Sequence, residues 1–262
     1  MKNDSNKQAL KIVMIGSGNV ATHLSEAFVA KGHKIVQVYS RTKKNAEALS
    51  KNIFSRPISD LKKITPDADI YIFAVNDDAV KELSEKIIFR DKIFLHTSGS
   101  LPLSVLKNNF SDCGVLYPLQ TFSKNRKINM QKVPICVEGS NKATEKIIFQ
   151  LAKSISKKVQ KINSEKRKIL HLAAIFVNNF PNHLFSIAEK LTTSEKINFS
   201  LLIPLMEETV SKIKTGQPAE MQTGPAIRKD KKIMDSHLKL LKNNQTAKEI
   251  YTIISKSIAQ KE

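Results

Sequence analysis

The residues with the clearest chemical potential stand near the start of the chain, in the segment IGSGNVA. A G-x-G-x-x-A pattern follows an apolar run at 11–15 and precedes a run with helical spacing; its residues are Gly16, Ser17, Gly18, Asn19, Val20 and Ala21. The first glycine permits a tight turn, the second lets a ligand approach the backbone, and the alanine keeps the helix near the sheet. Free N–H groups at a helix start bind phosphate. The segment therefore predicts a dinucleotide-binding loop; the alternative is a turn that only packs.

The end of the second apolar run indicates which dinucleotide such a loop would bind. A site for NAD places an acidic residue about 20 residues past the glycines, where it holds the ribose hydroxyls. Here the run ends in Ser40, Arg41 and Thr42, followed by two lysines, and no carboxylate stands in that position. A guanidinium between two hydroxyls suits a 2′-phosphate. We therefore predict NADP(H) rather than NAD(H); the alternative is that these cations only face solvent.

Polar side chains also follow later apolar runs, where ligands bind in sheets of this kind. Val75 and Asn76 end one run and are expected beside the cofactor. Ser98, in the loop HTSGS, is a candidate catalytic residue that could hold the nicotinamide amide or a substrate oxygen; a Ser/Thr turn is the alternative. Tyr117 and Gln120, in YPLQTF, are expected to line a substrate pocket unless that segment is a structural turn.

A third group of candidates lies on one apolar helix, in HLAAIFVNNFPNH. His171, Asn178 and Asn182 share a narrow stripe if each residue advances the helix by about 100°. We expect this stripe to line a cleft between two domains, with His171 as proton donor, Asn178 as a second catalytic residue and Asn182 facing the substrate. The alternative is a satisfied histidine at a domain interface.

The segment MQTGPAIRKD adds two candidates for contact with an anionic substrate. Thr223 and Arg228 flank a Gly-Pro turn that precedes a helix. The alternative for Arg228 is a local ion pair with Asp230.

The surrounding pattern predicts the elements that position these residues. Apolar runs predict strands at 11–15, 34–40, 67–75, 91–100, 133–139 and 159–162, and helical spacing predicts helices at 20–31, 43–51, 78–86 and 141–154. Such alternation is typical of a mostly parallel sheet. After 164 only helical segments follow, at 164–190, 195–214 and 230–259. We predict an α/β nucleotide-binding domain over 1–162 and an all-α domain over 163–262.

Composition narrows the function classes further. Hydrophobic residues make up 41% of the 262 residues, and no apolar run has the roughly 20 residues that a membrane span needs. Two cysteines are too few for a disulfide framework, so a cytoplasmic protein without a metal site is expected. The net charge of +19 suggests nucleic acid as a partner, but lysine carries most of it and is scattered. We therefore predict neither a membrane nor a nucleic-acid partner.

Six segments together resemble a known family. They are IGSGNVATHL, FAVNDDAV, LHTSGSLPLSVL, YPLQTFSK, HLAAIFVNNFPNHL and MQTGPAIRKD, and they cover most of the chain. The sequence resembles proteins that join an N-terminal Rossmann-like NADP oxidoreductase domain to a C-terminal helical domain of unknown function. That family is distantly similar to pyrroline-5-carboxylate reductase, ketopantoate reductase and the 6-phosphogluconate and hydroxyisobutyrate dehydrogenases. The resemblance implies a 6-phosphogluconate dehydrogenase-like helical domain that often builds a homodimer.

The resemblance does not carry a reaction with it. Hydroxyacid dehydrogenases of the broader group use a lysine one helical turn before an asparagine, whereas here Ile175 follows His171 by four residues and Lys168 has the wrong spacing to Asn178. The leading hypothesis is an NADP(H)-dependent oxidoreductase that moves a hydride to or from a small carbonyl or imine metabolite. The alternative is a protein that binds NADP(H) or a metabolite without catalysis.

Overall fold

The structure is a computed structural model that describes residues 9–260 and forms two compact units. The first unit extends to Asn178 and the second begins at Asn179. The last strand, β8 (Val159–Lys161), ends just before the predicted domain boundary at 162, and helix α6 (Ser164–Ala174) begins just after it. That boundary stays a prediction of domain organisation. Among the residues described, no helix is both long and apolar enough to cross a membrane.

The first unit is built on one eight-stranded sheet in the order β3-β2-β1-β4-β5-β6-β7-β8. Neighbouring strands are parallel except β6 and β7, which are antiparallel. The other strands are β1 (Lys11–Ile15), β2 (Lys34–Tyr39), β3 (Arg56–Ile58), β4 (Ile70–Phe73), β5 (Ile93–His96), β6 (Cys113–Pro118) and β7 (Ile135–Gly139). This order, with β1 at the centre of the parallel part, confirms the predicted Rossmann-like sheet.

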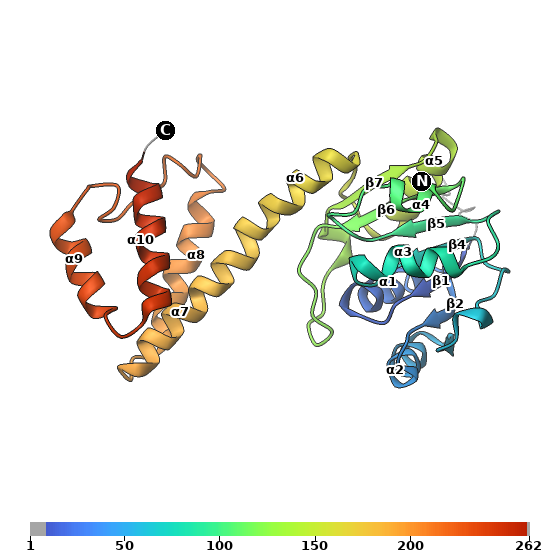
Figure 1. Cartoon of the computed structure of the whole chain (residues 1–262), viewed down its shortest axis with the longest axis horizontal. Helices are drawn as coiled ribbons and strands as arrows, with labels where there is room; N and C mark the ends of the chain where they lie inside the picture. The colour runs from blue at the N-terminus through green and yellow to red at the C-terminus, as the bar shows by residue number, and fades with distance from the viewer. Residues whose placement is uncertain (1–8, 261–262) are drawn as a thin grey trace, which may run out of the picture. The chain divides into compact units, whose positions relative to one another are not determined.

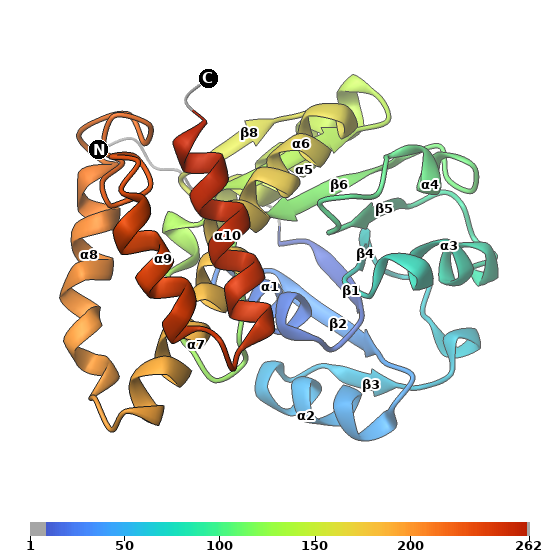
Figure 2. The same cartoon turned by 60° about the vertical axis from the view of Figure 1, so that its left-hand side comes forward.

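Helices cover both faces of this sheet, as Figures 1 and 2 show. Alternate residues of each strand point to opposite faces, so Ile12 and Met14 belong to one core while Val13 and Ile15 belong to the other. The first core also contains apolar residues of α1 (Asn19–Val29), α2 (Lys43–Ile53) and α5 (Lys142–Ile155). The second core contains those of α3 (Asp77–Lys86) and α4 (Ser104–Lys107). Burial on both faces explains why the strands are almost continuously apolar.

Two strands were not predicted from the sequence. Strand β3 has only three residues and includes Pro57, and proline is uncommon in strands. Strand β6 contains Gly114, whose missing side chain is required because a Cβ there would lie 2.2 Å from a methyl carbon of Ile148. Both strands exist because neighbouring strands pair with them, which local sequence does not reveal.

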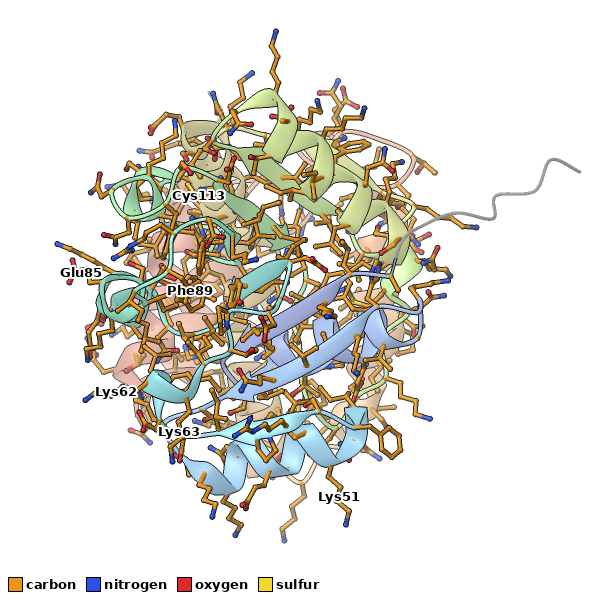
Figure 3. The ribbon with its side chains drawn as sticks, turned by 90° about the vertical axis from the view of Figure 1, so that its right-hand side faces the viewer. Lys51, Lys62, Lys63, Glu85, Phe89 and Cys113 are labelled. Atoms are coloured by element: carbon orange, nitrogen blue, oxygen red, sulfur yellow. The ribbon has the colours of Figure 1, made fainter. Side chains whose placement is uncertain are left out.

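Lysines of the first unit lie on its outer surface, and most of its large apolar side chains are buried. Figure 3 shows Lys51, Lys62 and Lys63 at the rim near α2 and the short helix η1 (Leu61–Lys63). Inside, Phe89 packs on other aromatic rings, including that of Phe94 at a centroid distance of 5.9 Å. The labelled lysines are therefore solvated charges on two elements, α2 and η1.

A π-helical turn interrupts the long helix predicted over 164–190. It is η3 (Ile175–Asn179), and helix α7 (Phe180–Ser194) follows it directly. Pro181 explains the interruption, because proline lacks the N–H for a helical bond and its ring clashes with the carbonyl four residues earlier. A π turn contains more residues than an α turn. The assumption of 100° per residue therefore fails between His171 and Asn178, and the predicted narrow stripe is not continuous.

The second unit is entirely helical, as predicted. Besides α7 it contains η4 (Phe199–Leu202), α8 (Ile203–Lys212), α9 (Lys231–Leu240) and α10 (Gln245–Ala259). The segment predicted as one helix over 230–259 is two helices, because Asn244 begins α10 as its N-cap. Within the described part of this unit, Ala226, Leu241 and Ala247 are the buried apolar residues, while most large apolar side chains are exposed.

Candidate active site

The glycine loop has the backbone geometry that a diphosphate site requires. Gly16 has a φ of +128°, and its N–H donates to the carbonyl of Tyr39 at 2.8 Å. A Cβ at Gly16 would lie 2.1 Å from the carbonyl oxygen of Ala74, so only glycine fits there. A Cβ at Gly18 would meet no atom within 4 Å, and helix α1 starts at the next residue. Open space in front of a helix N-terminus fits the diphosphate of a dinucleotide.

A single cavity of about 340 Å³ joins the glycine loop to the ends of the neighbouring strands. All ten residues predicted to bind the cofactor line this cavity: Gly16, Ser17, Gly18, Asn19, Val20, Ser40, Arg41, Thr42, Val75 and Asn76. The sequence analysis missed six further lining residues, which are Tyr39, Asn45, Ala74, Ala79, Leu83 and Thr97. The cavity thus runs from the end of β2 across β1 and β4 to the end of β5.

The β2 end of the cavity carries the groups predicted to hold a 2′-phosphate. The Ser17 hydroxyl donates to that of Ser40 at 2.9 Å, which ties the glycine loop to this strand end. Arg41 is exposed, and within residues 9–260 no carboxylate forms an ion pair with it. Asn45, on the first turn of α2, adds an amide to the same wall. Cation, hydroxyls and amide therefore remain available for an anionic group.

The start of α1 also binds a segment far along the chain. The Asn19 side-chain amide donates to the carbonyl of Phe122 at 2.8 Å. The His23 ring lies 5.0 Å from the Phe122 ring, and its Nε2 lies 2.9 Å from the carbonyl oxygen of Ser123. These contacts hold the segment after β6 against the helix that begins at the glycine loop. They join residues about a hundred positions apart, so no local sequence signal predicts them.

Two residues predicted separately meet at the carboxyl ends of β5 and β6. The Tyr117 hydroxyl lies 3.0 Å from Nδ1 of His171, which is on α6. A Cβ at Gly99 would lie 2.6 Å from the same nitrogen, so glycine is needed where the ring packs on the loop. Burial raises the pKa of the Tyr117 phenol to about 12, and the phenol therefore keeps its proton at neutral pH. Thr97, which lines the cavity, precedes Gly99 by two residues.

Ser98 closes the loop in which Gly99 lies. Its hydroxyl oxygen accepts from the backbone N–H of Ser100 at 3.1 Å and of Leu101 at 3.0 Å, which is the Ser/Thr turn considered as the alternative. Its own N–H donates to Nδ1 of His96 at 3.2 Å. His96 is fully buried, and this burial, followed by the charge of Arg167, lowers its pKa to about 4. A neutral imidazole therefore supports the loop at pH 7.

A buried arginine holds α6 to the sheet and was missed by the sequence analysis. Arg167 is 0% exposed and bonds the Glu138 carboxylate of β7 and the Leu101 carbonyl. The Ser164 hydroxyl donates to the same carboxylate at 2.8 Å and accepts from the Leu103 N–H at 2.9 Å. This network fixes the helix that carries His171 relative to the loop after β5. Its only sequence signal is an arginine inside a helical pattern, which usually indicates a solvated face.

The other predicted catalytic and substrate residues all have exposed side chains. Asn178, in the π turn, is exposed. Gln120 folds back locally, since its side-chain oxygen accepts from the N–H of Thr121 at 2.8 Å. Three residues belong to the second unit, where all are exposed: Asn182, Thr223 and Arg228.

The alternative of an ion pair between Arg228 and Asp230 is wrong. The Asp230 carboxylate caps α9 by accepting from the N–H of Ile233 at 3.1 Å. No ion pair joins it to Arg228 in the described part of the chain.

Comparison with known proteins agrees with this architecture. Residues 11–98 match the family model described as NADP oxidoreductase coenzyme F420-dependent, and residues 133–258 match a domain of unknown function, DUF2520. A candidate NADP oxidoreductase from Bacteroides fragilis is 36% identical, with a TM-score of 0.92 over 97% of this chain and 99% of that one. None of the curated proteins matches the sequence.

More distant solved structures share the fold. The reductive aminase from Aspergillus terreus, in complex with NADPH and ethyl levulinate, is 12% identical with a TM-score of 0.73 over 96% of this chain and 94% of that one. The 1-pyrroline-5-carboxylate reductase from Streptococcus pyogenes is 12% identical with a TM-score of 0.64 over 97% and 99%. Since the Bacteroides protein matches over nearly its whole length, the chain belongs to the family of NADP oxidoreductases in which a Rossmann-like domain is followed by DUF2520.

Proposed function

We propose that the protein is an NADPH-dependent reductase of a small carbonyl or imine metabolite. Membership of the NADP oxidoreductase family assigns NADP(H) as its cofactor. The proposal that the substrate is a carbonyl or an imine rests mainly on one observation. A single cavity joins the glycine loop, Arg41 with its neighbours Ser40 and Thr42, and Thr97. The Tyr117–His171 pair packs against the loop that begins at Thr97. The solved relatives with this fold include a reductive aminase and a 1-pyrroline-5-carboxylate reductase.

The chain's own residues divide the work of binding. N–H groups at the start of α1 would hold the diphosphate, and Arg41, Ser40 and Thr42 would hold the 2′-phosphate. Asn76 and Thr97 would contact the nicotinamide end of the cavity. When bound, NADPH supplies the hydride for the substrate carbon.

The proton has to come from the protein or from water. His171 is half-buried, it is fixed by Tyr117, and it packs on the loop that follows Thr97. We therefore propose His171 as the general acid that gives a proton to the substrate oxygen or nitrogen. Ser98 and Asn178 stay candidates for holding the substrate.

The test is a substrate screen with the purified full-length protein. Consumption of NADPH is followed with aldehydes, ketones and ketone–amine mixtures, and His171→Ala is compared with His237→Ala. General acids contribute about 10² to 10⁴ in rate, so H171A should lose that factor in kcat and keep its NADPH affinity. The H237A control removes another tyrosine-paired histidine, in the second unit, and should keep its activity. Equal kcat in wild type and H171A would remove His171 from the mechanism.

A second candidate function is a binding protein that holds NADP(H) without turnover. It is favoured because the chain lacks the lysine that hydroxyacid dehydrogenases have one helical turn before an asparagine. Lys168 does not replace that lysine, since it lies 3.5 Å from the Glu165 carboxylate on the outside of α6. This candidate predicts tight NADPH binding and no consumption with any substrate of the screen. Turnover of one carbonyl or imine would exclude it.

We also propose that the helical unit pairs with a second copy of the chain. Its exposed large apolar side chains include Leu201 at 71%, Leu205 at 65%, Leu240 at 81% and Ile253 at 68%. Large apolar side chains exposed in this number are typical of an interaction surface, and a stable interface has about 20 residues a side. Sedimentation velocity tests this: a monomer at micromolar concentration would contradict the dimer, and Leu205→Glu should dissociate it.

A further inference from the structure

The Tyr117 hydroxyl occupies one of the two nitrogens of the His171 ring. The partner of one imidazole nitrogen determines which atom of the ring is left for chemistry. We propose that Tyr117 is a positioning residue that binds His171 through Nδ1, so that Nε2 is the atom that transfers the proton. This inference rests on the proposed reduction and deepens it.

Two groups pack against the Nδ1 edge of the His171 ring, the Tyr117 phenol and the backbone at Gly99. The Tyr117 and His171 rings meet edge to face, with centroids 5.9 Å apart and planes at 79°. Gly99 lies next to the same nitrogen and leaves room for both rings, since a Cβ there would lie 2.6 Å from Nδ1 and 2.9 Å from Cζ of Tyr117. The backbone beneath the pair continues from Thr97 in the cofactor cavity. The imidazole is therefore held by a phenol and by a backbone surface rather than by a carboxylate.

A hydroxyl suits both protonation states of the ring because it can donate and accept. When His171 carries two protons, its Nδ1–H donates to the Tyr117 oxygen and Nε2–H faces away from the tyrosine. In the proposed reduction, the Nε2 proton would pass to the substrate oxygen or nitrogen, which would leave the imidazole neutral with its proton on Nδ1. Nε2 then takes a proton from water. The Tyr117 proton is never consumed, which agrees with a phenol that stays protonated at neutral pH.

The second unit contains a matched pair that serves as a control. The Tyr251 hydroxyl lies 2.9 Å from Nδ1 of His237, and these rings also meet edge to face, 5.7 Å apart at 87°. This pair joins α10 to α9 and lines none of the cofactor cavity described above. Tyr251→Phe therefore removes the same kind of hydrogen bond between residues that do not line that cavity.

The experiment combines ring-nitrogen NMR of ¹⁵N-labelled full-length protein with steady-state kinetics. We expect Tyr117→Phe to shift the His171 nitrogen resonances and to lower kcat about five- to tenfold, with the NADPH Kd and the substrate KM within about twofold. Y251F should shift the His237 resonances alone and keep kcat. Gly99→Ala, which retains the hydroxyl but displaces the ring, should also lower kcat.

Each result is decisive. Unchanged His171 resonances in Y117F overturn the pairing, and unchanged kcat overturns the positioning role. An equal loss of kcat in Y251F would show that the effect is only structural. If wild-type protein reduces no carbonyl or imine, the proposed function fails, and the spectra still decide whether Tyr117 holds His171 through Nδ1.

Discussion

Arg41 is the residue to which we assign the choice between the two nicotinamide cofactors. It stands at the β2 end of the cavity, beside Ser40 and Thr42, and NADPH differs from NADH only by the phosphate that this cluster would receive. Replacing Arg41 by alanine should therefore weaken NADPH binding and leave NADH binding unchanged.

The size of the effect follows from the exposure of the side chain. Hydrogen bonds to charged groups contribute about 1.5–3 kcal/mol net. Arg41 is exposed, so solvent screens its charge and the lower end applies, which corresponds to about a tenfold rise in the NADPH Kd. Arg41→Lys should lose less, because it keeps the charge and loses only the fork geometry.

The assay is fluorescence titration of the purified protein with NADPH and with NADH, at low and at moderate salt. Lys43→Ala is the matched control, since Lys43 is two residues away but lies 3.7 Å from Glu47 and does not line the cavity. We expect R41A alone to lower the preference for NADPH, and the difference to shrink as salt rises. An equal loss for both cofactors, or the same loss in K43A, would refute a phosphate contact at Arg41.

Two further predictions concern the glycine loop and the buried histidine. Gly16→Ala should abolish NADPH binding and lower Tm by several degrees, because a Cβ would clash with Ala74 and a strained backbone costs about 1–3 kcal/mol. Gly18→Ala should weaken NADPH binding at unchanged Tm, because the space at its Cβ is open. A G16A protein with the wild-type Tm would contradict the loop geometry. Burial lowers the pKa of His96 to about 4 in the folded protein, against 6.5 in the unfolded chain. Between these pH values only the unfolded chain binds the proton. The free energy of unfolding therefore falls by about 3 kcal/mol as the pH drops from 6.5 to 4. Urea unfolding at pH 7 and 4.5 should show a loss of about 2 kcal/mol in wild type and a smaller one in His96→Asn, and equal losses would refute the prediction.

The cofactor half of the site could be predicted because its residues are local in sequence. The spacing of Gly16 and Gly18 predicts a phosphate-binding loop, since a strand, a tight turn and a helix follow one another directly. Ser40 and Arg41 end the next strand, and parallel strands bring their carboxyl ends to one edge. The hydrophobic periodicity and the order of the strands were therefore enough to predict ten of the residues that line the cavity.

The residues that we propose for catalysis could be predicted only as separate candidates. Tyr117 and His171 were both named, but their contact depends on β6, whose identity as a strand comes from its neighbours, and on a helix held by the buried Arg167. Gly99 lies in the segment HTSGS, whose sequence does not indicate that two rings from distant segments, Tyr117 and His171, need the space of a missing side chain there. Pro181 was the available signal for the π turn that interrupts the long helix.

What the sequence by itself determined was the alternating scaffold and the phosphate loop, because hydrophobic period and backbone freedom are properties of neighbouring residues. Only the tertiary structure decided which strand is antiparallel, which arginine is buried and which tyrosine meets the histidine. Those outcomes depend on contacts between residues 17 to 66 positions apart, from the pairing of Pro118 with Ile135 to the bond of Arg167 with Leu101. Such contacts join separate elements, so the local sequence does not reveal them.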